Sequence, residues 1–170
     1  PESNIRVSAC FRAEDGTFAP VFTAAKLRQY PADFGSASLL ASMPDEAVAE
    51  ASRALLEQLG FSGIAGVEFK RGSTDGTLYL VEMNPRPSLW FAAAAAKGHG
   101  LVLAQMDEWF GTDFAGGRRV LEEEVAWRYA LKDFSAALQR RMRPGGYVLP
   151  APKPEIPAGS KRCWAVWDAK

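Results

Sequence analysis

The chain has 170 residues, of which 48% are hydrophobic and 11% aromatic, so a single domain can bury roughly 70% of its extended-chain surface. Its 20 basic and 20 acidic residues balance, which leaves no net field to attract nucleic acid or an anionic membrane. Two cysteines are too few for a disulfide framework, and no apolar stretch is long enough to cross a bilayer. We therefore expect a cytoplasmic domain with no nucleic-acid or membrane partner, whose function depends on a local site.

The N-terminal third predicts a β-hairpin, a loop and a helix. Apolar residues alternate over 5–11 and resume over 18–24 after a Glu-Asp-Gly turn, which is typical of two paired strands. Residues 26–38 mix cations, Pro31 and Gly35 without a regular period, which favours a loop. Ser42 is expected to cap a helix that ends at Gly60. The predicted buried face of this helix comprises Val48, Ala51, Leu55 and Leu59.

The middle of the chain predicts a second hairpin and two helices. Residues 63–70 and 77–84 are both rich in β-forming side chains and are joined by the turn sequence RGSTDG. Ser88 can cap a short helix that contains five consecutive alanines, and a helix that is apolar on every side is expected to be buried. Residues 101–110 predict a further helix.

The C-terminal part predicts a strand over 125–131 and a helix over 134–142. Four prolines lie between 150 and 157, so this stretch is expected to be an extended connector. The final CWAVWD can add one more strand. We divide the chain into a main domain, residues 1–149, and a connector with a closing strand, residues 150–170.

Charged residues gather near the end of the second hairpin. Glu68 and Glu82 lie opposite each other if the turn between them has an odd number of residues centred on Asp75. Facing carboxylates repel unless a cation lies between them. With Asn84 they form an all-oxygen donor set that suits Mg²⁺ or Mn²⁺ rather than zinc, with phosphates completing the coordination shell. The alternative is that these side chains are a solvated face without a ligand.

The same residues resemble a known family. The sequence GVEFK, a turn and then LVEMNPR resembles the metal-binding hairpin of ATP-grasp enzymes, among them relatives of biotin carboxylase and carbamoyl-phosphate synthetase. The segment from Gly98 to Leu101 resembles the helix start that follows in this family, with His99 in place of the usual acidic residue. The resemblance covers about residues 5–111. It implies an α+β fold, in which helices cover a mostly antiparallel or mixed sheet.

The resemblance also implies roles for individual residues. Glu68, Glu82 and Asn84 would bind two magnesium ions, and Arg86 would contact the substrate or an acyl phosphate. Lys26 and Arg28 would supply further catalytic cations. Val81 would form the floor of the adenine pocket, and Lys70, on the same side of its strand as Glu68, is expected to contact ATP.

The implied activity is that of an ATP-dependent carboxylate ligase. In such an enzyme the γ-phosphate passes to a small-molecule carboxylate, and an amine or another nucleophile attacks the acyl phosphate. The family's N-terminal lobe and lid have no counterpart in this sequence, which begins with Pro1. We therefore expect a fragment that carries one half of the ATP site and is inactive alone. The alternative is a non-catalytic ATP-grasp-like module that binds a partner.

Overall fold

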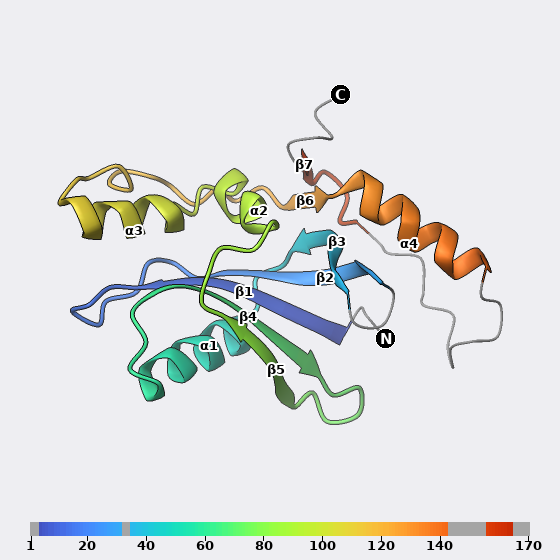
Figure 1. The fold of residues 1–170 in the computed structure, drawn as a ribbon, viewed down its shortest axis with the longest axis horizontal. Helices are drawn as coiled ribbons and strands as arrows, with labels where there is room; N and C mark the ends of the chain where they lie inside the picture. The colour runs from blue at the N-terminus through green and yellow to red at the C-terminus, as the bar shows by residue number, and fades with distance from the viewer. Residues whose placement is uncertain (1–3, 32–34, 143–155, 165–170) are drawn as a thin grey trace.

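A single seven-stranded sheet with helices on both faces forms the domain (Figure 1). The computed structural model describes residues 4–31, 35–142 and 156–164. Every neighbouring pair of strands is antiparallel except β6 and β7, so the sheet is mixed. The predicted α+β class is confirmed. In spatial order the strands are β5 (Leu78–Asn84), β4 (Gly63–Arg71), β1 (Ile5–Arg12), β2 (Phe22–Tyr30), β3 (Ser36–Ser42), β6 (Val125–Arg128) and β7 (Lys161–Trp164).

Four helices accompany the sheet. Figure 1 shows α1 on one side of the sheet and α2 and α3 on the other. Helix α1 contacts β1, α3 contacts β1 and β4, α2 contacts β6 and β7, and α4 contacts β2 and β3. Helix α4 therefore packs beside β2 and β3. The helices are α1 (Glu46–Gln58), α2 (Phe91–Ala96), α3 (Leu101–Phe110) and α4 (Ala130–Met142).

Strand β1 is buried on both faces because its two sets of alternate side chains enter different clusters. Val7 and Ala9 face α2 and α3, whereas Ser8 and Cys10 face α1. The buried hydroxyl of Ser8 lies 2.6 Å from that of Ser52 on α1, which satisfies both polar groups. Burial raises the pKa of the Cys10 thiol to about 11. Cys10 is therefore an inert packed thiol.

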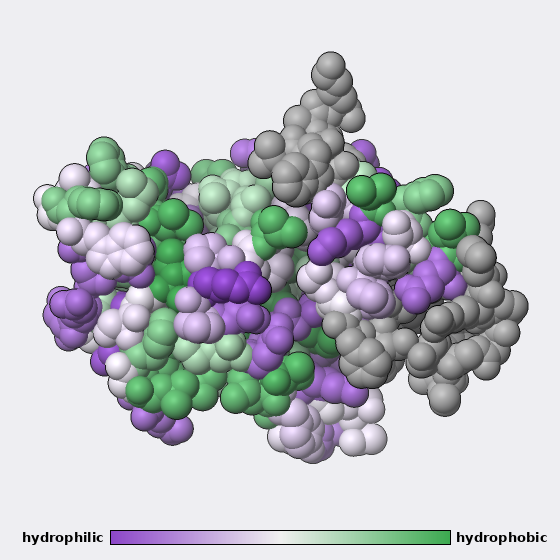
Figure 2. All heavy atoms as spheres, in the orientation of Figure 1, coloured by the Kyte–Doolittle hydropathy of each residue, from purple (hydrophilic) through white to green (hydrophobic). Residues whose placement is uncertain are grey.

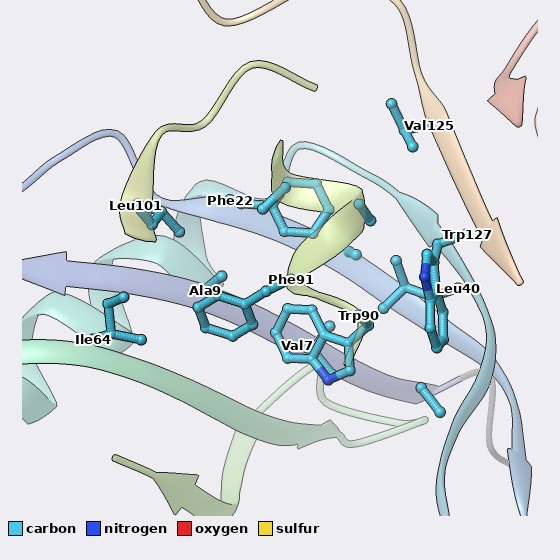
Figure 3. Packing of buried hydrophobic residues seen from close by; sticks show 14 of the residues in the cluster. Val7, Ala9, Phe22, Leu40, Ile64, Trp90, Phe91, Leu101, Val125 and Trp127 are labelled. Atoms are coloured by element: carbon cyan, nitrogen blue, oxygen red, sulfur yellow. The ribbon is translucent and has the colours of Figure 1, made fainter. Parts of the chain in front are cut away.

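The larger cluster joins residues that are distant in the sequence. Figure 3 shows side chains from β1, β2 and β3 beneath the start of α2, with Trp127 of β6 closing one end. Trp90 stacks at a tilt on Phe91, with ring centroids 5.0 Å apart. Both aromatic residues are buried, as the sequence predicts.

The predicted loop over residues 26–38 is wrong. Lys26–Tyr30 continues β2, and Ser36 begins β3, so these residues form the second and third strands of an antiparallel meander. Two features explain why the alternation of apolar residues does not indicate these strands. The side chains of Lys26 and Gln29 are buried although they are polar, and two register shifts near Arg28 interrupt the period-two alternation.

The start of the first helix also differs from the prediction. Ser42 is the last residue of β3 rather than a cap, and its hydroxyl accepts a hydrogen bond from the Val125 backbone at 2.7 Å. Asp45 is the N-cap, because its carboxylate accepts a bond from the Val48 backbone N–H. The helix is turned from its predicted face, since Leu59 is 60% exposed. The buried residues of α1 are Val48, Ala49, Ser52 and Leu56.

The later elements are found close to their predicted positions. Helix α3 has the predicted bounds, whereas β6 ends earlier and α4 begins earlier than predicted. Helix α2 is not buried all round, because Ala92 and Ala95 are exposed. Strand β7 overlaps the predicted final strand only at 163–164, and 165–170 lie outside the described residues. Most of the predicted proline-rich connector, residues 150–155, also lies outside them.

Protonation of His99 is expected to destabilise the fold. Its Nδ1 lies 2.8 Å from the Pro20 carbonyl oxygen and its ring packs edge-on against Phe22. Burial lowers the pKa of His99 below its ordinary 6.5. The unfolded state therefore binds the proton more tightly, and stability is lost as the pH falls below about 6.5. Urea unfolding at several pH values is expected to show that the advantage of wild type over His99→Gln shrinks in acid.

The comparison is specific because His99 is the only histidine of the sequence. Glutamine retains a donor for the Pro20 carbonyl but does not titrate. A wild-type advantage that stays constant between pH 7.5 and pH 5.5 would contradict the assignment.

Candidate active site

The β4–β5 hairpin brings the two predicted glutamates face to face. Glu68 and Glu82 are direct partners in the register of the two strands, as predicted. The predicted odd-numbered turn is wrong, because six residues, 72–77, lie between the paired Arg71 and Leu78. A register shift after Glu68 leaves Val81 as one extra residue on β5. This bulge restores the glutamate pairing that an even-numbered turn would otherwise offset.

Glu68 is a buried carboxylate with a buried cation beside it. Its Oε2 atom lies 2.6 Å from Nζ of Lys26, and the two side chains are 10% and 3% exposed. Val7 of β1 pairs with both Glu68 and Ala24, which brings β2 and β4 within reach of each other across β1. Burial raises the pKa of Glu68, Lys26 opposes this shift, and the neighbouring Glu82 adds to it.

Lys26 therefore belongs to the site, although not in a loop as predicted. Its ammonium group also lies 3.4 Å from Gln29 Oε1 and 3.4 Å from the Gly35 carbonyl oxygen. Gln29 was not predicted to take part. A glutamine three positions after a lysine does not by itself indicate a contact between them. Here the register shifts of β2 bring the side chains of Lys26 and Gln29 together.

On the edge strand β5, Glu82 is exposed and Asn84 is half-buried. The Asn84 amide Nδ2 donates a hydrogen bond to Glu82 Oε1 at 2.9 Å. Side chains two residues apart on a strand share a face, which places this pair on the same face as Glu68. The outer part of the carboxylate set is thus open to solvent and the inner part is closed.

Arg28 is separated from the glutamates. Lys26 pairs with Leu40 and Arg28 with Leu39, and neighbouring residues of β3 face opposite sides of the sheet. Arg28 donates to Asp133 of α4 at 2.7 Å, and Arg128 donates to the other oxygen of the same carboxylate at 2.9 Å. The sequence did not predict Asp133, because its partners are 105 and 5 residues away.

The remaining predicted site residues surround the hairpin. Lys70 and Val81 are exposed, on β4 and β5 respectively. Arg86 is exposed on the segment that links β5 to α2. Figure 2 shows hydrophilic side chains gathered across the middle of one face, between the regions of α2 and β5, with hydrophobic side chains on both sides. Lys70, Val81 and Arg86 are therefore accessible to solvent around the hairpin.

The pairing of Glu68 with Glu82 brings a small set of oxygen donors together. Glu68, Glu82 and Asn84 offer carboxylate and amide oxygens, which Mg²⁺ prefers. Within the described ranges no group of three or more His, Cys, Asp or Glu side chains could hold a metal ion. Glu68 and Glu82 supply only two carboxylates, so any ion bound here would need further ligands from outside this set.

Comparison with known proteins identifies the fold. Neither protein-family models nor curated proteins give a match. Among solved structures, pyruvate carboxylase from Rhizobium etli is similar, with a TM-score of 0.58 and 16% identity over 71% of this chain. A biotin carboxylase complex with βγ-ATP from Campylobacter jejuni has a TM-score of 0.56 and 14% identity over 73%. N5-carboxyaminoimidazole ribonucleotide synthetase from Thermus thermophilus has 0.54 and 16% over 74%.

These similarities confirm the predicted ATP-grasp-like fold. Biotin carboxylases, which the hairpin sequence resembles, are among the structural neighbours. The chain spans 12% of the pyruvate carboxylase, 29% of the Campylobacter enzyme and 35% of the Thermus enzyme. The likeness therefore concerns part of each neighbour.

In the described part of this chain, no helix has the length and apolar character needed to cross a membrane.

Proposed function

We propose that this chain forms the metal-binding and substrate-binding side of an ATP-dependent carboxylate ligase. The observation that carries the proposal is the register pairing of Glu68 with Glu82, in a hairpin of an ATP-grasp-like fold. Two carboxylates that face each other repel and destabilise a strand pair unless a cation lies beside them. Asn84 adds a neutral oxygen beside the more exposed of the two.

In the proposed reaction each residue has a distinct task. Glu68, Glu82 and Asn84 would hold two magnesium ions, which would neutralise charge on the triphosphate. Arg86 binds the anionic substrate and the acyl phosphate that forms when the γ-phosphate passes to its carboxylate. An amine or another nucleophile then attacks this acyl phosphate. Lys70 and Val81 contact the nucleotide, and a second lobe outside residues 1–149 closes over it.

The proposal is tested by Glu82→Gln in the full-length protein. Glutamine keeps the size of the side chain but removes the metal-binding charge, so ATP-dependent phosphate release is expected to fall by at least about 100-fold. The assay is screened over amino acids and small carboxylic acids with Mg²⁺ present. Glu57→Gln, an exposed carboxylate on α1, is the matched control and is expected to retain wild-type turnover.

The alternative function is a non-catalytic module that binds a partner. The Lys26–Glu68 pair favours it, because Glu68 already has a counterion within the chain. The exposed carboxylate of Glu82 opposite this pair supplies a second acidic ligand for a metal ion, which favours the ligase. Phosphate release that is unchanged in Glu82→Gln, or absent with every acid, would refute the ligase and leave the module.

A further inference from the structure

Lys26 occupies the position from which a cation neutralises Glu68. Its ammonium nitrogen is 2.6 Å from Glu68 Oε2, and both side chains are almost completely buried. A buried carboxylate requires a counterion, since an uncompensated buried charge costs several kcal/mol. A divalent ion held by Glu68 would answer the same requirement. The lysine and the metal ion therefore compete for one carboxylate.

From this geometry we infer that Lys26 sets the metal affinity of the site by exchanging with the ion at Glu68. The inference rests on the proposed function and deepens it. Before metal binds, Lys26 neutralises Glu68. When metal binds, the ammonium group leaves Glu68 and is available to an anionic oxygen of the substrate or nucleotide. Lys26 is in this respect a positioning residue for the metal.

The surroundings of Lys26 suit such an exchange. Gln29 Oε1 and the Gly35 carbonyl oxygen both lie 3.4 Å from its Nζ, so a small shift exchanges the charged acceptor for neutral ones without leaving the ammonium unsatisfied. Glu82 is opposite Glu68 and on the open side of the hairpin. An ion that arrives from solvent therefore meets Glu82 and Asn84 first and reaches Glu68 only by displacing Lys26.

The test measures Mn²⁺ binding to the full-length protein without nucleotide, from the electron paramagnetic resonance signal of the free ion. Lys26→Met removes the competing cation, so Mn²⁺ is expected to bind about tenfold more tightly or better. Lys26→Arg keeps a competing cation and is expected to show no gain. Adding Glu68→Gln to Lys26→Met is expected to abolish the gain. Arg53→Met, an exposed arginine paired with Glu46 on α1, is the control.

Each outcome decides the inference. Affinity that is unchanged or weaker in Lys26→Met overturns it. If Lys26→Met does not fold alone, Mn²⁺-dependent folding supports the inference, and failure of Mn²⁺ to restore folding contradicts it. If substitutions of Lys26 change neither Mn²⁺ binding nor ATP turnover, the exchange is refuted and the proposed ligase is unaffected. If the proposed ligase function is wrong, no carboxylic acid will stimulate ATP turnover by the full-length protein. The metal titrations do not measure this turnover, so the two failures are distinguishable.

Discussion

Lys26→Met is expected to lower the free energy of unfolding by about 3–5 kcal/mol in the absence of metal. The substitution leaves Glu68 buried beside the carboxylate of Glu82 with no cation in contact. Burial already raises the pKa of Glu68, so the loss of Lys26 makes its charged form still less favourable. Urea unfolding of the two proteins, followed by circular dichroism at neutral pH, measures the difference.

A second variant separates the cost of an unpaired charge from the value of the pair. Lys26→Met combined with Glu68→Met fills a similar volume without charge, and it is expected to recover most of the lost stability. The exposed pair of Arg53 and Glu46 provides the contrast, because its removal is expected to cost about 0.5 kcal/mol or less. Equal losses at the buried and exposed pairs would contradict the interpretation.

Trp127→Ala is expected to cost about 3–5 kcal/mol of folding free energy. Trp127 is fully buried on β6, where it packs against the end of the larger cluster (Figure 3). Its loss leaves a cavity at the end of this cluster, and the packed side chains around it can collapse into the space only in part. The measurement is again urea unfolding, and Leu59→Ala at an exposed position is expected to change little.

Trp127→Phe distinguishes packing from hydrogen bonding. The buried indole Nε1 has no hydrogen-bond acceptor among the described residues, so phenylalanine gives up volume without giving up a bond. We expect this variant to be clearly more stable than Trp127→Ala. If both variants lose the same stability, the aromatic volume is not what supports β6.

Local patterns predicted the elements whose partners are close in sequence. The β4–β5 hairpin followed from two apolar runs around a turn-forming sequence, and α3 from the periodicity of residues 101–110. The helix at 46–58 was also predicted, but its cap was misplaced by three residues. The hydrogen bond from the Val48 backbone to the Asp45 side chain identifies the cap.

The meander of β2 and β3 could not be predicted in this way. The pattern of alternation assumes that inward-facing side chains are apolar, whereas Lys26 is inward-facing and charged. Its counterion is 42 residues away, so nothing near Lys26 indicates that burial is possible. The pairing of β6 with β7 likewise joins segments separated by more than 30 residues.

The sequence predicted the pairing of the two glutamates but not the arrangement of the residues around them. The pairing of Glu68 with Glu82 followed from strand geometry, but through a turn of the wrong length. The sequence predicted the same role for Lys26 and Arg28, whereas Lys26 contacts Glu68 and Arg28 contacts Asp133. Residues two apart would share a face in a regular strand, and the register shift at this point of β2 separates them.

The β4–β5 hairpin is held firmly where it joins the sheet and only loosely at its turn. On the sheet side, β4 is fixed by eight consecutive register positions with β1, which hold Glu68 in place, and Glu82 is positioned through the pairing of β5 with β4. On the other side, the turn over residues 72–77 is bonded chiefly to itself, through Asp75, Thr77 and Gly72. Insertions in this turn would project into solvent beyond the last paired residues, which makes it a suitable attachment point for a reporter peptide or dye.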